Sequence, residues 1–238
     1  MTGSMPVVLV TGGYDHKIRF WEATSGVCAR TLVFGDSQVN CLAISADKSL
    51  LAAGGNPHIH LFDINNNSNS SSSTSNSGGG GGGSSSSSSS GEDKPILSYE
   101  RHTSNVTSVG FQKDRKWLYS GSEDGTVRIW DPRANVSTTR TYDTTVAVNT
   151  VAISPNEMEL ISGDQNGNLV KYEIIGSQIN PEPEYGYDPD DGVVKKRDVK
   201  SAVVSVSMSD GNNEGLIGTE AGCIYYVNFN DKVCIKLV

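Results

Sequence analysis

Five copies of one short pattern divide this chain at nearly regular intervals. Each copy mixes apolar and polar residues and ends in an aromatic or apolar anchor followed by a polar residue. The copies are Ile18-Arg19-Phe20-Trp21-Glu22, Ile59-His60-Leu61-Phe62-Asp63, Val127-Arg128-Ile129-Trp130-Asp131, Leu169-Val170-Lys171-Tyr172-Glu173 and Ile224-Tyr225-Tyr226-Val227-Asn228. The anchor is the fourth residue of each copy, and two of the four intervals between anchors are roughly 40 residues, a period that indicates a fold built from equivalent units.

The longest interval, from Phe62 to Trp130, contains a segment of very different composition. Residues 65–94 are almost entirely Asn, Ser and Gly, with a run of six glycines followed by seven serines. Burial of such side chains cannot offset the entropy lost on ordering them, so we expect a disordered insertion. Without this segment, the interval also shortens to roughly 40 residues, in agreement with the period of the repeat.

The units consist of short alternating runs separated by polar turns. In the third unit, runs at 106–111 and 117–122 precede a tight turn at 123–125 and a run ending at Trp130. Alternation with period two and Gly/Asp turns predict antiparallel strands. A period of about 40–45 residues with four strands is typical of a β-propeller blade. We therefore expect an all-β propeller with about five recognisable blades: blades one and two in 1–64, the insertion in 65–94, blades three and four in 95–184, an acidic-to-basic linker in 185–200, and a divergent fifth blade in 201–238.

The third unit resembles a WD-repeat blade. In such blades a buried hydrogen-bond chain connects His, Ser or Thr, Asp and Trp. Relative to Trp130, this sequence has Asp124 at −6, Ser122 at −8 and His102 at −28, and these four residues are the predicted structural tetrad. The first unit keeps Asp15 at −6 from Trp21, but Gly13 stands at the expected hydroxyl position.

Over residues 7–184 the chain further resembles the small WD-repeat subunit of target-of-rapamycin (TOR) kinase complexes, the LST-eight or G-protein-β-like family. The turn Gly13-Tyr14-Asp15-His16 followed by Asp36–Asn40 is the most specific part of this similarity. The other matching segments are Arg19-Phe20-Trp21, Ser25–Cys28, His58-Ile59-His60, Ser108–Phe111, Glu123-Asp124, Glu159–Gln165 and Pro181–Glu184.

The resemblance implies a non-catalytic scaffold that binds and stabilises the kinase domain of a TOR-like serine/threonine kinase, with the other complex subunits as indirect partners. It also implies a cytoplasmic location, with recruitment to endolysosomal membranes through the complex. A generic WD-repeat adaptor of another assembly, of ubiquitin-ligase or ciliary type, is the alternative, which the tail after Tyr185 favours slightly.

The expected ring is incomplete. The family resembles a closed seven-bladed ring, which needs roughly 300 residues at this period. The chain has 238 residues, with the insertion included. In the family, the innermost strand of the first blade comes from the C-terminal end of the chain, and no equivalent is recognisable here. We expect an unpaired strand edge, in a divergent or truncated chain or in one whose ring a partner completes.

Charge and composition exclude several other functions. The net charge of −8 disfavours a nucleic-acid backbone as partner, and no apolar run reaches the length of a membrane span. The N-terminus resembles no secretory signal. The four scattered cysteines indicate a reducing compartment. His58 and His60 share one face of a strand but lack further ligands, so we expect no metal, cofactor or small-molecule substrate, and no constellation of residues suggests an enzyme.

The loops at one face of the ring remain as the candidate partner surface. On a propeller this face carries the residue before each turn aspartate and the polar residues that flank the first strand of each blade. Mixed polar and aromatic side chains suit a protein partner better than a substrate pocket. The candidates are Tyr14, Gln38, Asn40, Asn105, Thr107, Glu123, Asn149 and Gln165.

Overall fold

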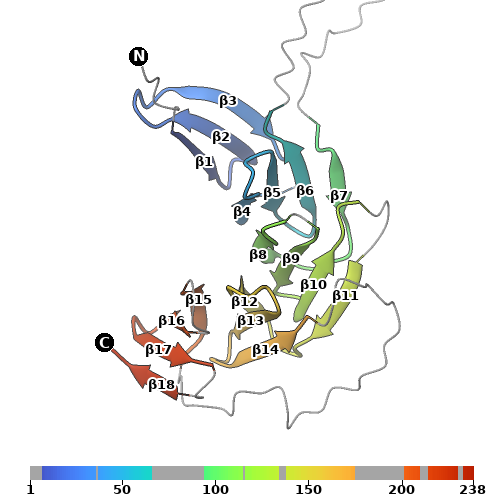
Figure 1. The fold of residues 1–238 in the computed structure, drawn as a ribbon. Helices are drawn as coiled ribbons and strands as arrows, with labels where there is room; N and C mark the ends of the chain where they lie inside the picture. Colours follow the sequence, from blue (N-terminus) through green and yellow to red (C-terminus); the bar gives the residue numbers. More distant parts are fainter. Residues whose placement is uncertain are drawn as a thin grey trace, which may run out of the picture.

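The computed structural model describes residues 7–35, 37–65, 94–114, 116–133, 138–174, 201–209, 214–229 and 233–238. Most of the predicted insertion and the whole predicted linker lie outside these ranges. The described residues form five antiparallel sheets that follow one another around an arc, from β1–β3 to β15–β18 (Figure 1). The prediction of an all-β propeller with about five blades is confirmed. No helix in the described ranges is long and apolar enough to cross a membrane.

Each sheet is one blade, numbered 1 to 5 along the chain. Blade 1 contains β1 (Val8–Gly12), β2 (Lys17–Glu22) and β3 (Cys28–Val33). Blade 2 contains β4 (Cys41–Ile44), β5 (Leu50–Gly54), β6 (Ile59–Asp63) and β7 (Leu97–Tyr99). Blade 3 contains β8 (Val106–Phe111), β9 (Leu118–Ser122), β10 (Thr126–Trp130) and β11 (Thr138–Asp143). Blade 4 contains β12 (Val148–Ile153), β13 (Glu159–Asp164) and β14 (Leu169–Glu173); blade 5 contains β15 (Val203–Met208), β16 (Glu214–Thr219), β17 (Ile224–Asn228) and β18 (Val233–Lys236).

The hydrophobic core lies between neighbouring blades rather than inside any one of them. Val127 and Ile129 of blade 3, for example, pack in one buried cluster with Val148, Val151 and Leu160 of blade 4. The inner strands β4, β8, β12 and β15 are successive neighbours along the arc. Because each strand alternates its side chains between two faces, one blade contributes to the core on both of its sides.

A glycine near the end of β9 lets blades 3 and 4 approach closely. A Cβ on Gly121 would lie 2.6 Å from Val151 Cγ2 and 2.8 Å from Val148 Cγ1. The same clash with a valine at the start of the next blade's first strand, or in the loop before it, recurs in three other blades: Gly12 with Val39, Gly54 with Val106, and Gly163 with Val203. These glycines therefore set the spacing between blades through the absence of a side chain.

Blade 1 has the predicted strand edge. Its strand β1 pairs with β2, and among the described residues no strand pairs with its other edge. Val8 and Leu9 are 51% and 56% exposed, and the arc in Figure 1 is open between blade 5 and blade 1. Val10, between these two residues and the turn, packs against the buried cluster that blades 1 and 2 share.

Candidate partner-binding face

A buried hydrogen-bond chain lies in blade 3 at the base of the candidate face. His102 Nδ1 lies 2.8 Å from Asp124 Oδ2, and His102 Nε2 lies 2.7 Å from Ser120 Oγ. Trp130 Nε1 donates to the same Ser120 Oγ at 2.8 Å. A neutral imidazole protonated on Nδ1 satisfies every contact, because it donates to Asp124 and accepts the Ser120 hydroxyl proton. These hydrogen bonds connect the loop before β8 to strands β9 and β10.

The bridging hydroxyl is Ser120, and the prediction of Ser122 for this role is wrong. In the β9–β10 ladder Trp130 pairs with Leu118, so Ser120 is one diagonal step away and Ser122 is two. Two residues of strand span about 7 Å, within reach of an indole, whereas four span about 14 Å. Ser122 Oγ instead accepts from Asp124 N at 3.1 Å and donates to Ser104 O at 3.4 Å, so it stabilises the turn.

A hydroxyl at the position equivalent to Ser120 also contacts the anchor in blades 1 and 4, which was not predicted from the sequence. Trp21 Nε1 donates to Thr11 Oγ1 at 2.8 Å, and Tyr172 Oη lies 3.0 Å from Ser162 Oγ. Thr11, Ser120 and Ser162 each precede their anchor by ten residues. Gly13 is therefore not the position of a lost hydroxyl in blade 1, contrary to the prediction. A hydroxyl therefore stands ten residues before the anchor in blades 1, 3 and 4, whereas Ala52 and Ile217 stand there in blades 2 and 5.

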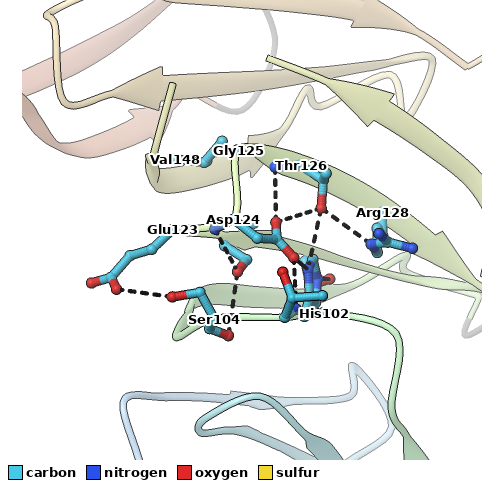
Figure 2. A network of polar contacts seen from close by, with 12 residues as sticks. His102, Ser104, Glu123, Asp124, Gly125, Thr126, Arg128 and Val148 are labelled. Carbon is cyan, nitrogen blue, oxygen red and sulfur yellow. Dashed lines mark hydrogen bonds and ion pairs between the residues drawn. The ribbon is translucent and has the colours of Figure 1, made fainter. Parts of the chain in front are cut away.

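Asp124 anchors the turn that presents the candidate face. Its Oδ1 accepts from Thr126 N at 3.0 Å and from Thr126 Oγ1 at 2.6 Å, and its Oδ2 accepts from Thr103 N at 3.0 Å (Figure 2). Burial raises the pKa of Asp124, but the hydrogen bonds from Thr126, Thr103 and His102 outweigh it and hold the pKa below its ordinary value. Burial lowers the pKa of His102, against the opposing effect of Asp124, so the imidazole is neutral at pH 7.

Four of the eight candidate residues form one connected group across blades 2 and 3. Asn105 Oδ1 accepts from Gln38 Nε2 and from Asn40 Nδ2, each at 3.4 Å. Asn105 Nδ2 donates to Glu123 Oε2 at 2.8 Å. Gln38 and Asn40 lie in the connection that leads into β4, Asn105 precedes β8, and Glu123 lies in the β9–β10 turn. We call these four residues the polar relay.

The other four candidates are not part of the polar relay. Thr107 Oγ1 donates to Val148 O at 2.7 Å, and Asn149 Nδ2 donates to Val203 O at 2.9 Å. These two side chains therefore connect the inner strands of neighbouring blades. Tyr14 is 88% exposed at the β1–β2 turn, and Gln165 is exposed at the β13–β14 turn. Both lie at turns of blades 1 and 4 that are equivalent to the β9–β10 turn of blade 3.

Two residues near the relay were not predicted from the sequence. Ser104 Oγ donates to Glu123 Oε2 at 3.4 Å, and Thr126 binds the carboxylate of Asp124. Thr126 stands two residues after Asp124, the spacing of a local hydroxyl-to-carboxylate contact, whereas no sequence pattern marks Ser104. Within the described ranges, no group of three or more His, Cys, Asp or Glu side chains could hold a metal ion. The polar relay and Ser104 offer amides, a hydroxyl and the exposed carboxylate of Glu123, which are groups suited to docking a protein.

The blades and the matched repeats define the chain as a protein of the WD-repeat β-propeller class. The family model described as "WD domain, G-beta repeat" matches residues 26–63 and 93–131. A chain in the solved structure "Crystal Structure of Mitotic Checkpoint Complex" superposes with a TM-score of 0.70, covering 97% of this chain and 60% of that chain. Its sequence identity of 19% makes this a likeness of fold alone.

The curated relatives are more specific. The chain is 40% identical over 214 residues to "Target of rapamycin complex subunit wat1" of Schizosaccharomyces pombe, which covers 88% of this chain and 57% of that protein. It is 49% identical over 155 residues to "Target of rapamycin complex subunit LST8-1" of Arabidopsis thaliana, covering 65% and 43%. It is 44% identical over 158 residues to LST8 of Saccharomyces cerevisiae, covering 66% and 44%.

These matches confirm the predicted resemblance to the LST8 family of WD-repeat subunits of TOR complexes. The chain spans about half the length of the curated relatives it matches.

Proposed function

We propose that this chain is a non-catalytic scaffold subunit of a TOR complex that binds and stabilises the kinase domain of a TOR-like serine/threonine kinase. The names of its relatives support membership in such a complex rather than in a ubiquitin-ligase or ciliary assembly. The observation that carries the proposal is the polar relay, a connected group of side chains from two blades on one face of a rigid platform.

A scaffold of this kind acts through rigidity. The relay and the buried chain of blade 3 meet in one turn, because Glu123 belongs to the relay and its neighbour Asp124 to the buried chain. Side chains held in place before binding lose less conformational entropy when a partner docks. The relay therefore offers the kinase domain a preformed surface, and the binding energy stabilises the bound conformation of that domain.

The same proposal covers catalysis and location. The amides and the carboxylate of the relay have docking chemistry, and we assign the catalytic activity of the complex to the kinase and none to this chain. We place the chain in the cytoplasm and at endolysosomal membranes, to which the complex recruits it. Imaging of a fluorescently tagged chain with and without the kinase tests this location.

Affinity purification of the intact chain, with quantitative mass spectrometry of its partners, tests the proposed function. A TOR-like kinase should be recovered in stoichiometric amount. Replacing both Gln38 and Asn40 by alanine should reduce its recovery, because these side chains lie on the proposed docking face. The matched control is Lys116→Ala in the turn between β8 and β9, whose exposed ion pair with Asp114 lies at the opposite end of the strands.

Recovery of a different stoichiometric partner in place of the kinase would refute the TOR assignment. Equal loss of the kinase in the control variant would refute the assignment of this particular face.

A further inference from the structure

Glu123 is an oriented carboxylate without a cationic partner on the proposed docking face. We infer that Glu123 receives a cationic side chain of the partner, an arginine guanidinium or a lysine ammonium, and that Asn105 is the residue that positions it. The inference rests on the proposed function and adds the chemistry of one contact to it.

The polar relay fixes the orientation of the Asn105 amide. Its Oδ1 accepts from two amide nitrogens, those of Gln38 and Asn40, so its Nδ2 faces Glu123. A flipped amide would bring three NH₂ groups together and a carbonyl oxygen against the carboxylate. The contact of 2.8 Å between Asn105 Nδ2 and Glu123 Oε2 is therefore imposed by residues of the neighbouring blade.

Both donors bind the same oxygen of Glu123. Asn105 and Ser104 donate to Oε2, and Oε1 has no partner among the described residues. Glu123 is exposed, and its side chain points towards Ser104, away from Asp124 (Figure 2). One oxygen is thus held in place, and the other faces outward as a free acceptor.

Three other carboxylates of the described blades each pair with a basic side chain of the same chain. Asp15 pairs with Arg19, Asp131 with Arg133 and Glu159 with Lys171. Among the described residues no Lys, Arg or His forms an ion pair with Glu123. Its negative charge is therefore available for a cation from outside.

The relay raises the value of such a contact. Exposed ion pairs contribute little when two flexible side chains must both be ordered. Here one partner is ordered beforehand, and docking removes water from the pair, which strengthens the attraction. Charge-assisted hydrogen bonds of this kind also speed association and make it sensitive to salt.

The chain contains a matched control for this charge. Glu220 follows Gly218 by two residues, as Glu123 follows Gly121, so it occupies the equivalent turn of blade 5. Ala202 stands there at the position of Asn105, directly before β15, and cannot orient a carboxylate. Glu220 is exposed as well, so replacing either glutamate by glutamine removes one surface charge.

Binding of purified TOR-like kinase to the intact chain, measured by biolayer interferometry, tests the inference. At about 0.15 M ionic strength, Glu123→Gln should raise Kd about tenfold, and the difference in Kd from the parent should shrink at higher salt. Glu220→Gln should bind as the parent does. Asn105→Ala should weaken binding more in the parent than in the Glu123→Gln background, because part of its effect acts through that carboxylate and the rest through Gln38 and Asn40. Thermal melts verify that each variant is folded.

The outcomes separate the inference from the proposed function. Kinase binding by the parent with equal affinity for Glu123→Gln overturns the inference alone. A loss of affinity that does not change with salt also overturns it, because a charge pair must be screened. A parent chain that does not bind the kinase overturns the proposed function, and the inference with it.

Discussion

Replacing Ser120 by alanine should destabilise the protein far more than replacing Ser122. The Ser120 hydroxyl bridges His102 Nε2 and Trp130 Nε1, and all three side chains are almost fully buried. Its removal leaves one acceptor and one donor without a partner, each costing about 1–3 kcal/mol. The vacated volume is smaller than that of a water molecule, so no solvent can replace the bridge.

We expect a total loss of roughly 3 kcal/mol for Ser120→Ala, which lowers Tm by about 10 °C in a chain of this size. Ser122→Ala loses only the contacts to Asp124 N and Ser104 O at the turn, for which about 0.5–1.5 kcal/mol is typical. Urea titration followed by tryptophan fluorescence measures both values, and calorimetry provides the melting temperatures.

A double-mutant cycle isolates the bridge itself. In a Trp130→Phe background the indole donor is already absent, so Ser120→Ala should cost less there than in the parent. If Ser122→Ala proves as damaging as Ser120→Ala, or if the cycle shows no coupling between Ser120 and Trp130, the hydrogen-bond chain described for blade 3 is wrong.

Three further perturbations test the packing between blades and the buried turn. Gly121→Ala should lower the free energy of unfolding by about 1–3 kcal/mol in urea titrations, because its Cβ would meet Val148 and Val151. Gly218→Ala should lower it less, since the nearest neighbour there is the movable side chain of Ser205. Equal losses of stability in the two variants would contradict the glycine–valine spacing. Trp130→Ala should lower the free energy of unfolding by roughly 3–5 kcal/mol, clearly more than Trp21→Ala, because Trp130 is 0% exposed and Trp21 is partly exposed at the open end of the arc. A melting temperature that is lower for Trp21→Ala than for Trp130→Ala would refute this order. The urea midpoint should fall as the pH drops below 6.5, because the lowered pKa of His102 means that the unfolded chain takes up a proton there at a higher pH than the folded chain does. The midpoint should fall again in acid as Asp124, whose pKa is also lowered, loses its charge. A midpoint that is independent of pH, or a slope between about pH 7 and 5 that is unchanged in His102→Gln, would contradict the buried neutral imidazole.

The residues alone were enough to predict the architecture. Regularly spaced anchors and alternating runs predict strands locally, and a repeated unit of short strands can bury its apolar faces only against its neighbours. The resemblance to WD-repeat blades supplied three members of the buried hydrogen-bond chain, His102, Asp124 and Trp130, and the resemblance to a seven-bladed family implied the open edge at β1. These residues could be assigned because their spacing relative to Trp130 matches the WD-repeat pattern.

Strand pairing and the approach of neighbouring blades determined which side chains contact one another. Ser120 and Ser122 are equally plausible in the sequence, and only the pairing of Leu118 with Trp130 selects Ser120. Likewise Asn105 lies 65 residues from Asn40 along the chain, and only blade packing brings their amides within 3.4 Å. Side-chain contacts across strands and blades depend on register and distance in three dimensions, and spacing along one chain does not specify either of them.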